Sequence, residues 1–190
     1  MVFTNFDQLI EKVKGYPARK RMAVAAAGDE HTLQAVMHAR KEGIVDPLLV
    51  GDKAEIDRIL GEMGETVAPE HIFDYPDVKE AAEYAVHLVR EGEADFLMKG
   101  RLDTAVILKA VVNKEHGLGQ GRTMSHFTMF EIPTYHKILV PVDGGMVTYP
   151  TLEQKKEQIR LITEILHKMG YGEDIKVGVL CAAENVSPKI

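Results

Sequence analysis

Short apolar runs alternate with amphipathic segments along the first 112 residues of the chain. Such runs, bounded by turn residues, are typical of the buried strands of a parallel sheet. They occupy residues 22–27, 46–50, 72–74 and 94–98. After each run, apolar residues recur at helical spacing within segments delimited by Gly or Asp. These expected helices occupy residues 28–43, 52–61, 77–92 and 104–112. The alternation predicts an α/β fold in three layers, with a mainly parallel sheet covered by helices on both faces.

A further amphipathic helix is expected before the first strand. Thr4 can cap its amino end, and Gly15 ends it. Its apolar stripe, which we expect to be buried, consists of Phe6, Leu9, Ile10 and Val13.

Beyond residue 112 the alternation stops. Residues 125–130 and 137–142 both have the pattern of strands, and Pro133 separates them. They form either an antiparallel ribbon or a step between two sheets. A helix is then expected over residues 151–169, and a last apolar strand over residues 176–181.

The segment after Pro133 is too short for a complete domain, because one or two strands with one helix cannot close a core. We therefore predict a first α/β domain over residues 1–133 and an incomplete second α/β domain over residues 134–190. The apolar stripe from Ile159 to Met169 would then be partly uncovered, so we expect a homo-oligomer.

Composition narrows the class of protein. Apolar residues make up 45% of the chain and charged residues 27%, as in ordinary globular proteins. The net charge of −6 disfavours a nucleic-acid partner. The single cysteine, Cys181, excludes an internal disulfide and a multi-cysteine metal site. The first residues have neither the basic head nor the long apolar stretch of a signal peptide, and no apolar run reaches the ~18 residues of a membrane span, so we expect a cytoplasmic protein.

One candidate phosphate site follows the apolar run at residues 94–98. Gly100 lies between Lys99 and Arg101, and a helix is expected to begin at Thr104. A glycine lets the backbone approach a ligand, and the free N–H groups of a helix start attract anions. The same pattern arises in any strand–helix unit that needs a glycine and a capping residue, and that alternative has about equal weight.

A second candidate follows the glycines at 117, 119 and 121. Within a few residues it has a guanidinium, two hydroxyls and an imidazole, which belong to Arg122, Thr123, Ser125 and His126. The guanidinium fork matches two phosphate oxygens, and the hydroxyls can donate to the same group. The alternatives are a surface arginine, hydroxyls that cap a strand edge, and a histidine satisfied within the structure.

Two aspartates have both a chemical and a structural interpretation. Asp103 and Asp143 have carboxylates suited to acid or base work, but they stand at a helix start and in a turn, where Asp is common. We predict the structural role for both and leave Asp103 as a possible substrate contact. The histidine spacing fits no zinc site, and no metal is expected.

Six short motifs are dispersed along the chain: Ala27-Gly-Asp-Glu30, Asp46-Pro-Leu-Leu-Val-Gly-Asp52, Met98-Lys-Gly-Arg-Leu-Asp-Thr104, Gly121-Arg-Thr-Met-Ser-His126, Asp143-Gly-Gly-Met146 and Ala182-Ala-Glu-Asn-Val-Ser187. Together they resemble the phosphate acetyl/butyryltransferase family, and phosphate butyryltransferases in particular. The resemblance implies two α/β domains of the isocitrate/isopropylmalate dehydrogenase-like fold, with the active site between them. It also implies transfer of an acyl group from acyl-CoA to phosphate, giving acyl phosphate and CoA, with coenzyme A as a substrate and no cofactor. Arg122 matches an arginine that such enzymes direct at the phosphoryl group.

The chain departs from the family in length. Family members are usually about half as long again, and the residues that bind and deprotonate the thiol of coenzyme A lie in that further part. The catalytic base therefore stays unassigned. A second hypothesis is a shortened non-catalytic relative or fragment that binds phosphate or acyl-CoA. A third, a nicotinamide-dependent decarboxylating dehydrogenase, is weaker because the sequence has no cluster of aspartates for a metal.

Overall fold

The computed structural model describes residues 3–181 and residue 185. Its contacts divide the chain into two compact units, Lys12–Gln120 and Met1–Glu11 with Gly121–Ile190, which are described separately below. This division lies earlier in the chain than the expected boundary at 133/134. The physical reason is that the segment beginning at Gly121 packs on the last helix of the chain, through Thr123 and Glu157. Most of the Ala182–Ser187 motif lies outside the described residues.

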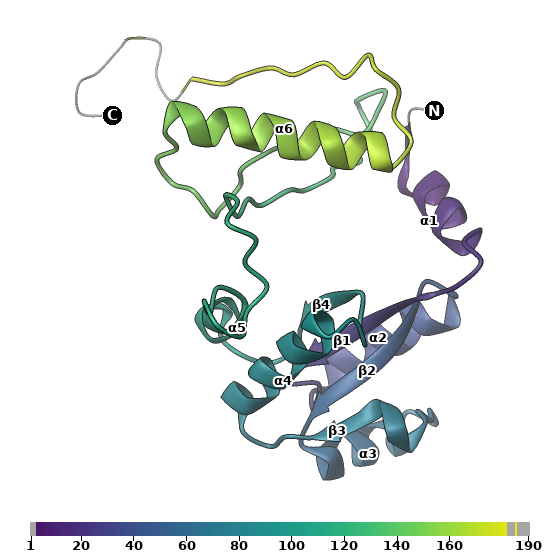
Figure 1. Ribbon diagram of the computed structural model, residues 1–190. Coiled ribbons are helices and arrows are strands. Elements are labelled where there is room, and N and C mark those ends of the chain that lie inside the picture. Colours follow the sequence, from purple (N-terminus) through teal and green to yellow (C-terminus); the bar gives the residue numbers. More distant parts are fainter. Residues whose placement is uncertain (1–2, 182–184, 186–190) are drawn as a thin grey trace. The chain divides into compact units, whose positions relative to one another are not determined.

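A parallel four-stranded sheet forms the centre of the Lys12–Gln120 unit (Figure 1). Its order is β3-β2-β1-β4, so β1 has β2 on one side and β4 on the other. Val24 of β1 stands opposite Leu49 of β2 and Met98 of β4. The predicted parallel α/β sheet is thereby confirmed, with strands β1 at Lys20–Ala25, β2 at Val45–Gly51, β3 at Ile72–Asp74 and β4 at Phe96–Lys99.

Helices cover both faces of this sheet, because successive strand residues point to opposite sides. Val24 and Leu49 belong to one core cluster, together with residues of α2 (Glu30–Lys41) and α3 (Lys53–Glu62). On the other face, Ala23, Ala25 and Val50 cluster with residues of α4 (Val78–Arg90) and α5 (Thr104–Val111). A 3₁₀ turn at Pro69–His71 precedes β3. The three-layer prediction holds for this unit.

Aspartates begin three of these helices, and for α3 and α4 the sequence predicts this. The side chains of Asp29, Asp52 and Asp77 accept backbone N–H bonds from the first turns of α2, α3 and α4. Asp103 occupies the same position before α5, but its side chain accepts no capping hydrogen bond. The helix start expected at Asp103 is confirmed, but a side-chain capping bond is absent.

The unit that contains Gly121–Ile190 is built on one long helix. α6 spans Leu152–Lys168 and begins with a capping box, in which Thr151 and Gln154 exchange side-chain and backbone hydrogen bonds. The two strands expected at 125–130 and 137–142 are reduced to isolated antiparallel bridges, Phe127 with Val142 and Phe130 with Leu139. The antiparallel alternative is confirmed, although continuous strands do not form.

At both ends of the chain the structure differs from the expectation. Residues 176–181 pair with no strand in the described part of the chain, and Leu180 is 87% exposed. α1 runs over Phe6–Lys14, and Asn5, not Thr4, accepts the Gln8 N–H at its start. None of its described residues is fully buried. Leu9, Ile10 and Val13 are half-buried and Phe6 is exposed, so the apolar stripe is only partly covered. No helix among the described residues is long and apolar enough to cross a membrane.

Candidate functional site

A polar pocket lies at the carboxyl edge of the parallel sheet, where the strand order reverses around β1. Open parallel sheets bind ligands in the crevice at such a position. The pocket encloses about 510 Å³. Its lining comes from the loops after β1 and β4 and from α2 and α3, and comprises Gly28, Asp29, Glu30, His31, Glu55, Arg58, Ile59 and Arg101.

Arg101 and Asp29 join the two loops of this pocket. The guanidinium of Arg101 lies 3.7 Å from the carboxylate of Asp29, and its side chain is 81% exposed. Hydrogen bonds from the backbone and hydroxyl of Thr32, with the charge of Arg101 adding to them, hold the pKa of Asp29 below its ordinary value. Asp29 is therefore anionic at neutral pH, whereas Arg101 remains open to solvent.

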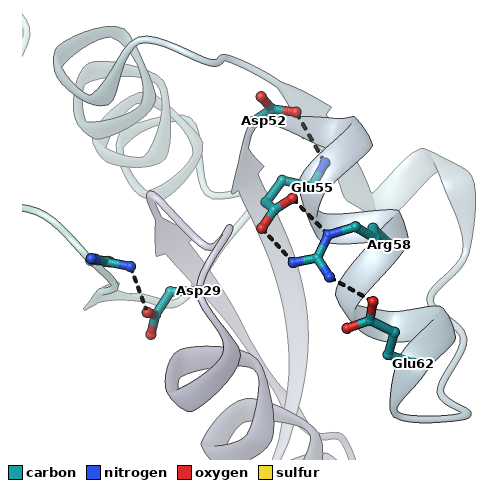
Figure 2. A network of polar contacts seen from close by, with 6 residues as sticks. Asp29, Asp52, Glu55, Arg58 and Glu62 are labelled. Atoms are coloured by element: carbon teal, nitrogen blue, oxygen red, sulfur yellow. Dashed lines mark hydrogen bonds and ion pairs between the residues drawn. The ribbon is translucent and has the colours of Figure 1, made fainter.

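The second arginine of the pocket, Arg58, is already neutralised. Figure 2 shows it between two carboxylates of α3, with Glu55 accepting two hydrogen bonds at 2.7 and 2.9 Å and Glu62 one at 2.6 Å. These hydrogen bonds raise the pKa of Arg58 further above its ordinary value. The N–H donors of Arg58 are occupied by carboxylates of its own helix, α3, so Arg101 is better placed than Arg58 to bind an incoming anion.

Lys99 and Gly100, two residues of the first candidate site, take part in local structure. The ammonium of Lys99 donates to the carbonyl of Leu102 over 2.7 Å. The Gly100 N–H donates to the carbonyl of Ala25 over 2.8 Å. A Cβ at Gly100 would stand 2.6 Å from that same oxygen, so glycine is needed for the close approach of two backbones. Their binding of phosphate stays a prediction.

Arg122 and Thr123, in the second candidate site, are held by carboxylates of α6. The guanidinium of Arg122 lies 3.2 Å from Glu164 and 3.6 Å from Glu157, and its side chain is 42% exposed. Thr123 donates its backbone N–H to Glu157 over 3.1 Å and donates its hydroxyl to the same carboxylate. These bonds from Thr123, and then Arg122, hold the pKa of Glu157 below its ordinary value. Hydrogen bonding to Glu164 first, and then to Glu157, raises the pKa of Arg122.

Ser125 and His126 have different surroundings. The hydroxyl of Ser125 is buried and has no hydrogen-bond partner in the described structure. Nε2 of His126 lies 3.3 Å from the Thr128 hydroxyl. A Cβ at Gly144 would come within 2.8 Å of Nδ1 of His126, so the imidazole packs against a glycine. These contacts favour the structural alternative for His126 and leave Ser125 unexplained.

A second, apolar pocket of about 190 Å³ has Ser125 among its lining residues. This pocket lies between α6 and the bridged segments before it. Its lining consists of Thr123, Ser125, Phe127, Val142, Gln158, Leu161, Ile162 and Ile165.

Asp143 has the structural role that the sequence predicts. Its carboxylate accepts the N–H groups of Gly145 and Met146 over 2.7 and 2.8 Å. Burial alone would raise the pKa of Asp143, but these backbone hydrogen bonds outweigh it and the pKa lies below the ordinary value. Among the described residues, no three or more His, Cys, Asp or Glu side chains converge on a possible metal position.

Sequence reasoning missed Glu157, Glu164 and Gln158. The two glutamates have the spacing of one helix face, but a carboxylate on an amphipathic helix looks like an ordinary solvated residue. Gln158 lies at a position that the helical pattern assigns to the core, and it is 6% exposed. A polar residue within an apolar stripe is a signal that could have identified it.

Comparisons with known proteins relate the whole chain to one group of enzymes. A family model described as phosphate acetyl/butaryl transferase matches residues 71–190. The phosphate butyryltransferase of Clostridium acetobutylicum is 42% identical over 186 residues, which is 98% of this chain. The phosphate acetyltransferase of Thermotoga maritima is 39% identical over 184 residues, or 97% of this chain. The chain spans 61% of the length of each of these two relatives.

A solved structure shares the fold. The branched-chain phosphotransacylase of Enterococcus faecalis V583 matches with a TM-score of 0.68 and 28% sequence identity. The match covers 90% of this chain and 59% of that protein.

Proposed function

The chain belongs to the phosphate acetyl/butaryl transferase family, and from this premise we propose that it serves acyl transfer between coenzyme A and inorganic phosphate. The observation that carries the proposal is the continuous similarity, 42% identity over 98% of the chain, to a phosphate butyryltransferase. The candidate residues of both units lie within the part of the chain that this similarity covers. The substrates are acyl-CoA and phosphate, and the products are acyl phosphate and CoA.

In the proposed reaction an oxygen of phosphate attacks the carbonyl carbon of the thioester. The new C–O bond forms as the C–S bond breaks, and the departing thiolate takes up a proton. Phosphate must be held and the developing charge balanced for this step. Arg122 suits the first task, because its partly exposed guanidinium can hold two phosphate oxygens.

Phosphate binding at Arg122 has a competitor within the protein. Glu157 and Glu164 already neutralise the guanidinium, and Glu157 also holds the hydroxyl of Thr123. An incoming phosphate replaces at least the Glu164 ion pair, which is exposed and therefore weak. Arg122 and Thr123 then donate to the ligand, and Glu157 keeps the Thr123 backbone N–H in place.

The proton acceptor and donor of the reaction remain unassigned. Asp143 is committed to a turn by its backbone hydrogen bonds. Asp103 is exposed and makes no capping bond, so its carboxylate stays a candidate substrate contact.

This proposal has three further parts: a preference for butyryl over acetyl as the acyl group, a homo-oligomeric assembly, and an isocitrate/isopropylmalate dehydrogenase-like arrangement of domains. They rest on the resemblance of the sequence and on the exposed apolar residues of the second unit, such as Val179 and Leu180. No cofactor is part of the proposal.

The proposal is tested by phosphate-dependent release of free thiol from butyryl-CoA by the 190-residue protein. We expect thiol release that requires phosphate and that is faster with butyryl-CoA than with acetyl-CoA. Absence of phosphate-dependent release, together with measurable binding of phosphate or butyryl-CoA, would favour the second hypothesis of a non-catalytic binding protein. Absence of both would overturn the proposal.

A further inference from the structure

Glu157 and Glu164 lie about two turns apart on α6, and both face the guanidinium of Arg122. Their surroundings differ. The side chain of Glu164 is 52% exposed and lies 3.2 Å from Arg122. The side chain of Glu157 is 30% exposed, and its Oε2 accepts both the backbone N–H and the hydroxyl of Thr123. Glu164 is therefore the carboxylate that an incoming anion can displace, whereas Glu157 is held in place beside the guanidinium.

The other oxygen of Glu157, Oε1, can accept a further hydrogen bond. It lies 3.6 Å from Nε of Arg122, and a carboxylate oxygen has two lone pairs. Hydrogen bonds from Thr123, with the charge of Arg122 adding to them, hold the pKa of Glu157 below its ordinary value, so Glu157 is anionic at neutral pH. An oxyanion that replaces Glu164 on the guanidinium thus meets a neighbouring negative charge that accepts hydrogen bonds and cannot donate them.

Tetrahedral oxyanions differ in how they interact with such a neighbour. Phosphate at neutral pH carries a P–OH group, which can donate to a carboxylate oxygen. Sulfate at the same pH carries no proton, so all of its oxygens are acceptors and are repelled by a carboxylate. A hydrogen bond to a charged acceptor is among the stronger ones in proteins. A fixed carboxylate beside an arginine therefore favours an oxyanion that has a proton to donate.

We propose that Glu157 determines the specificity of the phosphate site, because its Oε1 accepts a hydrogen bond from a P–OH group and repels oxyanions that carry no proton. The inference rests on the proposed binding of phosphate at Arg122. In the bound state Arg122 donates to the phosphate, the backbone N–H of Thr123 stays on Oε2 of Glu157, and Oε1 holds the protonated phosphate oxygen. The role is one of binding, and no covalent step is assigned to Glu157.

Competition between two anions tests the role of Glu157 without relying on turnover. Equilibrium dialysis of the wild-type protein with radiolabelled inorganic phosphate gives the dissociation constant, and unlabelled sulfate at neutral pH and constant ionic strength is the competitor. Phosphate is expected to bind roughly ten- to a hundredfold more tightly than sulfate, which is the range of a hydrogen bond to a charged group. Equal binding of the two anions, or no binding of phosphate, overturns the inference, and neither result depends on the folding of a variant.

The ratio of the two dissociation constants in three variants locates the preference. Glu157→Gln keeps a carbonyl oxygen for Thr123 and replaces the other oxygen with an amide donor, so the ratio should fall to about threefold or less. Glu164→Gln is the matched control, since it removes a charge from the same guanidinium. Both anions should bind it more tightly, with the ratio unchanged.

Arg122→Ala should abolish the binding of both anions, because it removes the cation that holds them. Circular dichroism confirms that each variant is folded before dialysis. A general distortion of the site weakens both anions alike, so a change in the ratio reports the acceptor itself. An unchanged ratio in Glu157→Gln, an equal fall of the ratio in Glu164→Gln, or selective binding that persists in Arg122→Ala contradicts the assignment.

The outcome separates this inference from the proposed function. Selective phosphate binding that becomes unselective in Glu157→Gln, without thiol release from any acyl-CoA, supports the role of Glu157 and removes the enzymatic proposal for this chain. Phosphate-dependent thiol release that sulfate inhibits as strongly in the wild type as in Glu157→Gln supports the enzyme and removes the role of Glu157.

Discussion

Thr123 donates both its backbone N–H and its hydroxyl to one carboxylate oxygen of Glu157, 34 residues further along the chain. The other oxygen of Glu157 lies 3.6 Å from Nε of Arg122. One side chain of α6 thus fixes two neighbouring residues of the candidate phosphate site. The carboxylate of Glu157 competes with phosphate for the donors of Thr123 and Arg122. A change at Glu157 should therefore alter both the positions of these two residues and the affinity for phosphate.

We predict that Glu157→Gln lowers the melting temperature at neutral pH. The folded-state pKa of Glu157 is depressed, first by the hydrogen bonds from Thr123 and then by Arg122. The stabilisation is therefore present above the ordinary pKa of about 4.3 and is lost as the pH falls through the lower folded-state value. Thermal unfolding followed by circular dichroism should show a difference from wild type at pH 7 that shrinks below about pH 4.

Glu153→Gln is the control for this experiment. Glu153 lies on the same helix and pairs with the nearby Lys156, and its side chain is 77% exposed. Its replacement should change the melting temperature little at any pH, because exposed ion pairs contribute little. Matching pH profiles for the two variants would contradict the role given to Glu157.

Replacement of Arg122 by alanine is expected to raise the KM for phosphate about tenfold or more. The guanidinium supplies paired donors to the proposed phosphate, and alanine supplies none. The KM of Arg122→Lys for phosphate should lie between those of wild type and Arg122→Ala, because lysine keeps the charge but loses the planar fork. Initial rates of thiol release at varied phosphate measure the effect. Arg160→Ala, at an exposed position of α6, is the control. If Arg122→Ala had the same KM for phosphate as Arg160→Ala, Arg122 would not belong to the phosphate site.

Gly100→Ala is expected to destabilise the protein by about 1–3 kcal/mol or more, as overpacking does. The new Cβ would stand 2.6 Å from the carbonyl oxygen of Ala25 and nearer to that of Ala26. Gly61→Ala is the matched control, since Gly61 lies in α3 with no atom within 4 Å of the added carbon. It should stabilise the protein by about 0.5–1 kcal/mol. Urea unfolding of both variants gives the comparison, and a neutral Gly100→Ala contradicts the close approach.

The sequence predicted most reliably what local chemistry determines. The aspartates at 52 and 77 begin helices because each can accept an N–H two or three residues ahead, so the signal and the structure lie within one turn. The parallel sheet followed from strands alternating with helices. Gly100 was identified as a position of close backbone approach, and the structure shows the chain at Ala25 and Ala26 approaching it.

Features that depend on distant partners were not predictable in the same way. Residues 176–181 have an apolar strand pattern, but a strand also needs a neighbour with which to pair, and none is present in the described part of the chain. The link from Thr123 to Glu157 was missed because nothing in a helical glutamate tells which distant N–H it will accept. Ser125 shows the opposite case, since its pattern suggested hydroxyl capping at a strand edge, and in the described structure the hydroxyl is buried without a hydrogen-bond partner.

Asp29 and Asp103 both stand at a helix start. Comparing them tests whether a carboxylate stabilises a helix by its position or by its hydrogen bonds. Asp29 accepts the N–H and hydroxyl of Thr32, both over 2.9 Å, whereas Asp103 makes no capping bond. Asp29→Ala should therefore cost about 1 kcal/mol of stability, and Asp103→Ala much less.

The pH dependence of these two variants adds a second criterion. The folded-state pKa of Asp29 is depressed by the Thr32 hydrogen bonds and by Arg101. Its contribution is therefore complete above the ordinary pKa of about 3.9 and disappears as the pH falls through the lower folded-state value. Urea unfolding at pH 7 and near pH 3 should show an Asp29→Ala deficit that is smaller in acid, because protonation removes the charge that strengthens the cap. Equal costs for both aspartates at pH 7 would mean that an aspartate at a helix start stabilises by its charge alone, through the helix dipole, and that the Thr32 contacts contribute nothing.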